Sequence, residues 1–281
     1  MTARRAFVLL SGGIDSTTCL HRAIRDFAPA GSSAVDGVTI DPKIVQAGDW
    51  VEAISVDYGQ RHRKEAEYAA KTCEKFGIKH SVLNIRGILD GAGVMLADAS
   101  VAIPDISYDE IKGVSPTYVP FRNGTLLSLI TAHAQKWVNA QIEELFNDEF
   151  AQYQRAPDVA ADMVIRQRAV GRMKDSAGIY FGAHAEDAAN WAYPDCTPEF
   201  IGSMANAMYV GSYSCVRLYT PLEWMDKRAV IEEGERLGVD WSLTWSCYAG
   251  GEKHCGACPT CRARKAGFVA AGVGDPTVYA A

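Results

Sequence analysis

The chain has 281 residues, of which 48% are hydrophobic, and its 28 Lys and Arg against 34 Asp and Glu give a formal net charge of −6. This length is enough for one large domain, or for one domain with a small appendage. The acidic balance argues against stable binding of a long nucleic acid by its phosphates. The sequence shows no signal-peptide core and no membrane-spanning run, so we expect a soluble, cytoplasmic protein without a membrane partner.

The first apolar run of the chain leads into a glycine-rich turn. Residues 6–10 (AFVLL) predict a buried strand, residues 11–16 (SGGIDS) a tight turn, and the following residues a helix as far as about residue 27. Gly12 and Gly13 let the backbone bend sharply near a ligand, and a helix N-terminus favours an anion. The turn therefore predicts a phosphate site, although a glycine pair alone also fits a plain strand-to-helix connection.

The string Ser-Gly-Gly-x-Asp-Ser resembles the pyrophosphate loop of the ATP pyrophosphatases. Members of that family bind ATP in a doubly wound α/β domain and transfer AMP to a substrate oxygen. No lysine follows the glycines, so the turn differs from the phosphate loop of P-loop NTPases. The resemblance implies that the phosphates of ATP are bound by Ser11, Gly12, Gly13, Asp15, Ser16 and Thr17.

The rest of the chain alternates between predicted strands and helices. Strands are expected over residues 51–56, 79–85, 177–182 and 216–219, and helices over residues 66–76, 125–150, 158–174, 200–208 and from residue 227 onward. We expect Asp226 to cap the last of these helices, and Glu232 and Arg236 to pair on its exposed face. The alternation predicts an α/β fold with a doubly wound, mostly parallel sheet.

Polar residues cluster where two of the predicted strands end. The second strand is followed by Asp57, Tyr58, Gln60 and Arg61, and the strand over residues 177–182 by His184, Glu186 and Asp187. In open α/β sheets, ligands bind at the carboxyl ends of the strands. We therefore expect both clusters at the active site.

Four of the eight cysteines lie close together near the end of the sequence. Cys247, Cys255, Cys258 and Cys261 have the spacing Cys-x7-Cys-x2-Cys-x2-Cys. In a cytoplasmic chain this spacing favours a metal over disulfides, and four thiolates complete a tetrahedral zinc site without an open position. We predict one structural zinc ion. An iron–sulfur cluster, free cysteines and His254 as a competing ligand are the alternatives.

Six segments, taken in order, closely resemble the 7-cyano-7-deazaguanine synthases, the QueC family. They are residues 11–16 (SGGIDS), 57–62 (DYGQRH), 119–123 (VPFRN), 193–196 (YPDC), 220–227 (TPLEWMDK) and the four cysteines. The resemblance covers residues 6 to about 268. It implies an ATP-binding domain over residues 1–240, with insertions near 29–50 and 136–176, and a zinc-binding C-terminal segment over residues 241–281.

This resemblance implies the ATP-dependent conversion of 7-carboxy-7-deazaguanine and ammonia to the nitrile 7-cyano-7-deazaguanine. Adenylation turns a carboxylate oxygen into a leaving group, ammonia then gives an amide, and a second activation of the amide oxygen gives the nitrile. The implied cofactors are ATP, Mg²⁺ and one structural Zn²⁺. We expect a homodimer, since most soluble oligomers of this kind are twofold dimers.

Roles follow residue by residue from the matched segments. The candidate catalytic residues are Asp15, Ser16, Arg122 and Lys227, and Asp57 and Arg61 are expected to bind ATP together with the residues of the loop. The expected substrate-binding residues are Tyr58, Gln60, Arg122, Asn123, Glu186, Asp187, Tyr193 and Asp195. Arginine suits a planar carboxylate, and carboxylates can accept hydrogen bonds from the guanine-like edge of the substrate.

Other functions fit parts of the sequence. A related amide-forming deazaguanine ligase would stop before the second activation, and a tRNA-thiolating ATP pyrophosphatase would also pair such a loop with cysteines. The negative charge and the closed four-thiolate spacing argue against thiolation. The intact loop argues against a zinc-binding interaction module on an inactive nucleotide fold.

Overall fold

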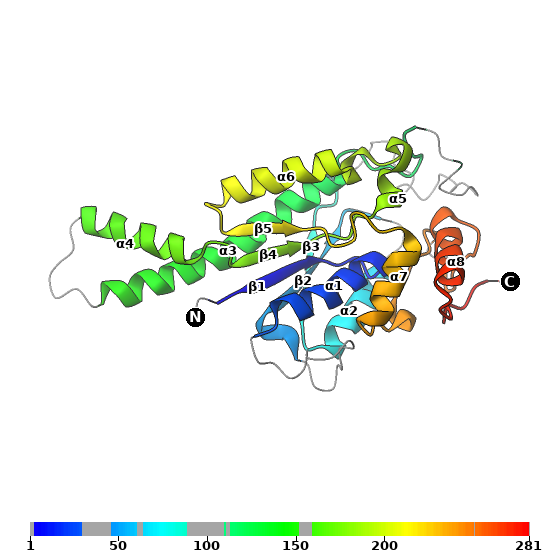
Figure 1. Ribbon diagram of the computed structural model, residues 1–281, viewed down its shortest axis with the longest axis horizontal. Helices are drawn as coiled ribbons and strands as arrows, with labels where there is room; N and C mark the ends of the chain where they lie inside the picture. The colour runs from blue at the N-terminus through cyan, green and yellow to red at the C-terminus, as the bar shows by residue number, and fades with distance from the viewer. Residues whose placement is uncertain are drawn as a thin grey trace.

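The computed structural model describes residues 3–29, 46–60, 64–88, 110, 113–151, 159–249 and 251–280 of the chain. Its centre is a five-stranded parallel sheet with helices on both faces, which confirms the predicted α/β class (Figure 1). Across the sheet, the strands run in the order β3 (Lys79–Asn84), β2 (Val51–Asp57), β1 (Arg5–Leu9), β4 (Ala177–Tyr180) and β5 (Val216–Tyr219).

The helices divide between the two faces of the sheet. They are α1 (Ile14–Phe27), α2 (Lys64–Lys75), α3 (Arg122–Phe150), α4 (Val159–Arg172), α5 (Ala185–Ala188), α6 (Pro198–Gly211), α7 (Lys227–Arg236) and α8 (Pro259–Ala271). Helices α1, α2 and α7 cover one face, and α3 and α6 cover the other, while α4 folds back along α3 at the end of the molecule opposite α8 (Figure 1). Among the described residues, none of the helices has both the length and the apolar composition needed to cross a membrane.

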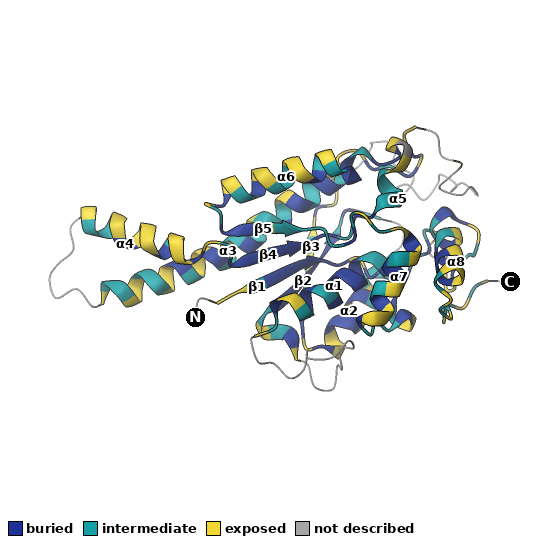
Figure 2. Ribbon diagram, in the orientation of Figure 1, coloured by how far each residue is buried: buried dark blue, intermediate teal, exposed yellow. Residues whose placement is uncertain are grey.

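Strand β1 shows why residues 6–9 are apolar without interruption. Its side chains alternate between the two faces of the sheet: Ala6 and Val8 pack in the core beneath α1, and Phe7 and Leu9 pack in the core beneath α3. Because helices cover both faces, both sets of side chains are buried, and no polar alternation is left in the sequence. Figure 2 shows the buried sheet between helices whose outer surfaces are exposed.

The strand order fixes where a ligand binds. The chain builds β1, β2 and β3 outward in one direction, and then crosses to the other side of β1 to add β4 and β5. This reversal leaves a crevice outside the carboxyl ends of β1 and β4, which is where doubly wound sheets bind their ligands. The loop after β1 and the polar cluster after β4 both open into this crevice.

The predicted strands and helices are present, with ends that differ by a few residues, whereas α5 and α8 were not predicted. Helix α3 begins at Arg122 rather than at residue 125, so the first turn of this helix carries Arg122 and Asn123. Helix α8 was not predicted, although Pro259 at its first turn and Gly272 just past its end, with a φ of 67°, are typical of helix boundaries.

The predicted ion pair on helix α7 is wrong. Glu232 accepts a hydrogen bond from Arg228 at 2.7 Å, and Arg236 pairs with Glu233 at 2.6 Å instead. Glu233 also binds Arg22 of α1 at 3.0 Å, which holds its carboxylate between the two arginines. A contact with a neighbouring helix therefore decides the pairing, and a pattern within one helix could not reveal it.

The Asp226 side chain caps α7, as predicted, by accepting a hydrogen bond from the Ala229 backbone N–H at 2.8 Å. We predict that Asp226→Ala lowers the free energy of unfolding by about 1 kcal/mol, because it leaves this amide without a partner. Urea denaturation followed by circular dichroism measures the change. Asp226→Ser restores a capping oxygen and should recover most of the loss; equal losses in both variants would contradict the capping role.

Candidate active site

A cavity of about 450 Å³ lies at the carboxyl ends of β1, β2 and β4. Its walls come from the glycine loop, the turn after β2, the start of α3, the segment after β4, and residues 245–264 near the C-terminus. The cavity therefore sits at the crevice that the strand order predicts, and it brings together segments that lie more than 200 residues apart in the sequence.

The glycine loop makes a turn that only glycine accommodates. Gly12 has a φ of 91°, and a Cβ added to it would lie 2.2 Å from the backbone oxygen of Glu65. Its own carbonyl accepts a hydrogen bond of 2.8 Å from the backbone N–H of Trp245. The turn is thus clamped between helix α2 and the C-terminal segment.

The backbone amides of the loop converge on one small region. The amides of Ser11 and Gly12 donate to the Ser16 hydroxyl at 3.2 and 3.3 Å, and the Gly13 amide donates to the Ser11 hydroxyl at 3.3 Å. Helix α1 begins at Ile14 without a side-chain cap. Converging amides beside an uncapped helix N-terminus form an anion site.

Lys227, at the start of α7, joins the loop to the strand β4 side of the cavity. Its Nζ donates to Asp15 Oδ1 at 2.6 Å and to His184 Nε2 at 2.9 Å. Burial acts to raise the pKa of Asp15, but the charge and the hydrogen bond of Lys227 act against it, and this pKa lies below its ordinary value. The Lys227 stem packs closely on α8, because a Cβ at Gly267 would lie only 2.6 Å from Lys227 Cγ.

A protonated lysine can only donate hydrogen bonds, so His184 Nε2 accepts from Lys227 and the ring proton lies on Nδ1. His184 is 4% exposed and lines the cavity. Its Nδ1 is buried without a hydrogen-bond partner among the described residues. The Asp187 carboxylate lies 3.3 Å from His184 Nε2.

The start of α3 is held by the segment after β4. Asp195 accepts a hydrogen bond of 2.9 Å from the Asn123 backbone N–H, and the Asn123 side chain donates to the Asp195 carbonyl at 3.2 Å and to Cys196 Sγ at 3.1 Å. Burial raises the pKa of Asp195, against the effect of the Asn123 amide and of Arg122. These contacts fix the first turn of α3 and hence the position of Arg122.

The turn after β2 closes on itself at the opposite wall. The Gln60 side chain accepts from the Tyr58 N–H at 2.9 Å and donates to the Val56 carbonyl at 3.0 Å. Asp57 forms two hydrogen bonds with Arg86, at 2.6 and 2.9 Å. The turn is thus held by its own hydrogen bonds, and the ion pair between Asp57 and Arg86 beside it is partly exposed.

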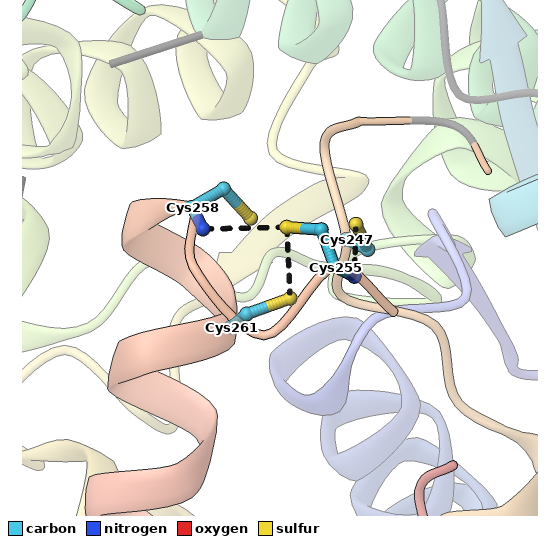
Figure 3. Close-up of side chains that lie close together, drawn as sticks. All are labelled: Cys247, Cys255, Cys258 and Cys261. Atoms are coloured by element: carbon cyan, nitrogen blue, oxygen red, sulfur yellow. Dashed lines mark hydrogen bonds between the residues drawn. The ribbon is translucent and has the colours of Figure 1, made fainter. Parts of the chain in front are cut away.

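The four cysteines come together into one cluster, with all four sulfur atoms within 4.8 Å of one another (Figure 3). Two backbone amides point at sulfur atoms: the Cys255 amide at Cys247 Sγ, 3.2 Å away, and the Cys258 amide at Cys255 Sγ, 3.3 Å away. The Cys255 and Cys261 sulfurs lie 3.9 Å apart. Bonds of about 2.3 Å to a tetrahedral zinc ion require a sulfur separation of about 3.8 Å. The donor set therefore fits a four-thiolate metal ion.

His254 is engaged elsewhere. Its Nε2 accepts a hydrogen bond of 3.0 Å from the Ser246 backbone N–H, and its ring packs on Trp245 at 4.1 Å. Burial lowers its pKa to about 4, so the ring is neutral. His254 is not among the grouped metal ligands, and it supports the cavity wall instead.

Arg264 of α8 organises the C-terminal segment. Its guanidinium is fully buried, pairs with Asp275 at 3.1 Å, and donates to the Thr244 hydroxyl at 2.9 Å and to the Ser246 hydroxyl at 3.3 Å. Arg264 and Ser246 also line the cavity. The segment that holds the cysteines is thereby part of the cavity wall.

Most of the predicted site residues line this one cavity. They are Ser11, Gly13, Asp15, Ser16, Asp57, Tyr58, Gln60, Arg122, Asn123, Asp187, Tyr193 and Lys227. Gly12, Thr17, Glu186 and Asp195 do not line it, and Arg61 lies outside the described residues. The Glu186 carboxylate accepts from the Lys227 backbone N–H at 3.0 Å, and the Thr17 hydroxyl is buried without a partner among the described residues.

Several lining residues were not predicted. His184 was expected near the site as part of the cluster after the fourth strand, but no role was assigned to it. Arg86 follows the predicted strand over residues 79–85, so the strand-end rule that found Asp57 and Asp187 could have found it. Trp245, Ser246 and Arg264 belong to the cysteine segment, and no local pattern in the sequence indicates that they face the cavity.

Comparison with known proteins identifies the family. A family model described as "Queuosine biosynthesis protein QueC" matches residues 31–173 and 167–272 of the chain. The chain belongs to the QueC family. This QueC-family chain is 35% identical over 277 residues to the 7-cyano-7-deazaguanine synthase of Chromohalobacter salexigens, covering 98% of the chain and 86% of that protein.

Two further relatives of this QueC-family chain carry closely related names. The 7-cyano-7-deazaguanine synthase of Caldicellulosiruptor saccharolyticus is 34% identical over 98% of the chain and 95% of its own length. The 7-cyano-7-deazaguanine synthase 1 of Colwellia psychrerythraea is 34% identical over 99% of both chains. The similarity therefore extends over nearly the whole chain and is not confined to the glycine loop.

The cysteine cluster gives a direct prediction. Cys261 is fully buried in the cluster, so Cys261→Ser should weaken metal binding by at least about tenfold. It should also speed amide hydrogen exchange at Trp245, whose N–H binds the glycine loop. Elemental analysis and hydrogen-exchange mass spectrometry measure the two effects.

The matched control is Cys73→Ser, because Cys73 is buried in the core of α2 and lies outside the cluster. This variant should keep the metal content of the unaltered protein. Full metal content in Cys261→Ser would contradict the assignment of the cluster.

Proposed function

We propose that this chain is a 7-cyano-7-deazaguanine synthase that uses ATP and ammonia to convert 7-carboxy-7-deazaguanine to the nitrile. The observation that carries the proposal is the full-length similarity to curated proteins of that name. The geometry supports it, because an anion-binding loop, an arginine and a lysine all face one cavity large enough for a nucleotide and a small heterocycle.

The proposed reaction uses two activations. A carboxylate oxygen attacks the α-phosphorus of ATP, pyrophosphate leaves, and ammonia displaces AMP from the acyl adenylate with loss of one proton to give the amide. The amide oxygen then attacks a second ATP. Loss of pyrophosphate, of AMP and of the two remaining N–H protons leaves the carbon–nitrogen triple bond. The protein contributes mainly positioning and charge stabilisation to these steps.

The residues divide these tasks according to their places in the cavity. The amides of residues 11–13 and of the first turn of α1 would bind the phosphates, and Lys227 would stabilise charge that develops on them. Arg122 would bind the carboxylate of the substrate, because guanidinium matches a planar carboxylate in two hydrogen bonds. Tyr58 and Tyr193 would contact the heterocycle.

We also propose which metal ions the protein binds, how its chain divides into domains, and its oligomeric state. Mg²⁺ would accompany ATP and neutralise phosphate charge, and the four cysteines would hold one Zn²⁺ that is structural because four thiolates leave no open position. We propose residues 1–240 as the ATP-binding domain and 241–281 as its zinc-binding appendage. A cytoplasmic homodimer without stable nucleic-acid binding fits the net charge of −6.

The test is to incubate the purified protein with ATP, Mg²⁺, ammonium and 7-carboxy-7-deazaguanine, and to identify the product by mass spectrometry. We predict the nitrile, with two ATP consumed per product. An amide as the final product would indicate the related amide-forming ligase, and the absence of any product would contradict the proposed function.

Lys227→Met keeps the length of the side chain and removes its charge. We predict that it lowers kcat/KM by about a hundredfold or more, because the lost cation faces developing phosphate charge. Lys136→Met, at an exposed position of α3, is the matched control and should retain full activity. Equal activity in the two variants would contradict the role of Lys227.

A further inference from the structure

The two reactants that the proposed function brings together carry opposite charges. At neutral pH the acid is a carboxylate, and ammonia is almost entirely ammonium. A site that accepts both needs one cation and one anion that the protein itself leaves without an ionic partner. Several charged side chains line the cavity. Those that form a salt bridge within the protein are already neutralised, and the others are available to a ligand.

Two carboxylates of the cavity are paired with cations of the protein. Asp15 binds Lys227 at 2.6 Å, and Asp57 binds Arg86 at 2.6 Å. Asp187 differs from them: in the described part of the chain, neither lysine nor arginine forms a salt bridge with it, and its neighbour is the His184 ring at 3.3 Å. Its side chain is 24% exposed and lines the cavity, so a small solute can reach it.

Arg122 is a cation of the cavity that lacks a carboxylate partner in the described part of the chain. It lines the same cavity and, among the described residues, forms no salt bridge with a carboxylate; its Nε donates to the Asn123 side chain at 3.3 Å. The cavity thus offers a guanidinium for an anionic reactant and a carboxylate for a cationic one.

The charge of Asp187 also affects the groups around it. Burial raises the pKa values of Tyr193, Asp195 and Cys196, and the negative charge of Asp187 adds to the rise at each of them. The negative charge of Asp187 therefore reaches these three neighbours, although burial is the larger cause of each rise.

We propose that Asp187, beside His184, forms the binding site for the ammonium co-substrate. The carboxylate accepts hydrogen bonds from the ammonium ion and holds the nitrogen on the β4 side of the cavity, near the acid group that Arg122 binds. The charge of the carboxylate suits ammonium, because hydrogen bonds from a cationic donor to an ionised carboxylate are stronger than those between neutral groups. This inference rests on the proposed function and adds the position of its second substrate.

The first experiment uses the unaltered enzyme. If ammonium is the species that binds, the KM for total ammonia stays nearly constant between about pH 7 and pH 8, where ammonium predominates. If neutral ammonia binds instead, this KM falls by about tenfold over the same unit of pH. A tenfold fall would overturn the proposal.

The second experiment compares two nucleophiles in Asp187→Asn, which removes the charge and keeps the shape. We expect the KM for ammonium to rise by about tenfold to a hundredfold, the effect of losing a hydrogen-bonded charge pair. Hydroxylamine is uncharged at neutral pH and should suffer much less, so the ratio of ammonium use to hydroxylamine use falls by the same factor. An unchanged ratio would overturn the proposal.

Two controls keep these results interpretable. Glu199→Gln removes an exposed carboxylate at the start of α6 and should leave the KM for ammonium unchanged. Exchange of pyrophosphate into ATP that depends on the carboxylate substrate needs no ammonium, so it shows whether Asp187→Asn is folded. If this variant is not folded, Asp187→Ser and the pH series of the unaltered enzyme test the proposal instead. Failure of the unaltered enzyme with both nucleophiles contradicts the proposed function, whereas an active enzyme with an unchanged ratio contradicts only the ammonium site.

Discussion

The site depends on one backbone hydrogen bond, from the Trp245 N–H to the Gly12 carbonyl. It joins the sharpest turn of the glycine loop to the segment that carries the cysteine cluster. On the other side of the turn, the Glu65 carbonyl leaves no room for a side chain at Gly12. The loop is therefore held from two directions, and its amides are oriented before a ligand arrives, which lowers the cost of binding.

This clamp gives the cysteine cluster a role in the active site without contact with substrate. Trp245 donates from its indole to the Cys247 carbonyl at 2.9 Å and lines the cavity, and the buried Arg264 binds Ser246 in the same wall. A metal ion that fixes the four sulfur atoms would fix this wall as well. The segment that carries the cluster thus forms part of the cavity wall, even though it follows the α/β domain in the sequence.

The sequence predicted the fold and the loop because both depend on local patterns. The strand at residues 6–10 and the glycines that follow it are contiguous, and their apolar and turn-forming character decides their structure. The cluster of four cysteines could also be predicted, because the ligands of structural zinc sites follow typical spacings in the sequence. The resemblance to the QueC family then supplied candidate residues at the strand ends, most of which line the cavity.

The remainder could not be predicted, because it depends on pairing across the fold. Asp195 accepts a hydrogen bond from the first turn of α3 and Glu186 from the first turn of α7, and the sequence predicted neither contact. That either carboxylate also binds substrate stays a prediction. No sequence pattern tells whether a carboxylate binds a ligand or a backbone amide. The contact between His184 and Lys227 spans 43 positions in the chain and appears only in three dimensions.

The most direct test of the account is a crystal structure with Mg²⁺ and a non-hydrolysable ATP analogue. We predict that the β- and γ-phosphates lie against the amides of residues 11–16, in place of the contacts that these amides make with the Ser16 hydroxyl in the free loop. A nucleotide bound elsewhere, with these amides still directed at Ser16, would contradict it.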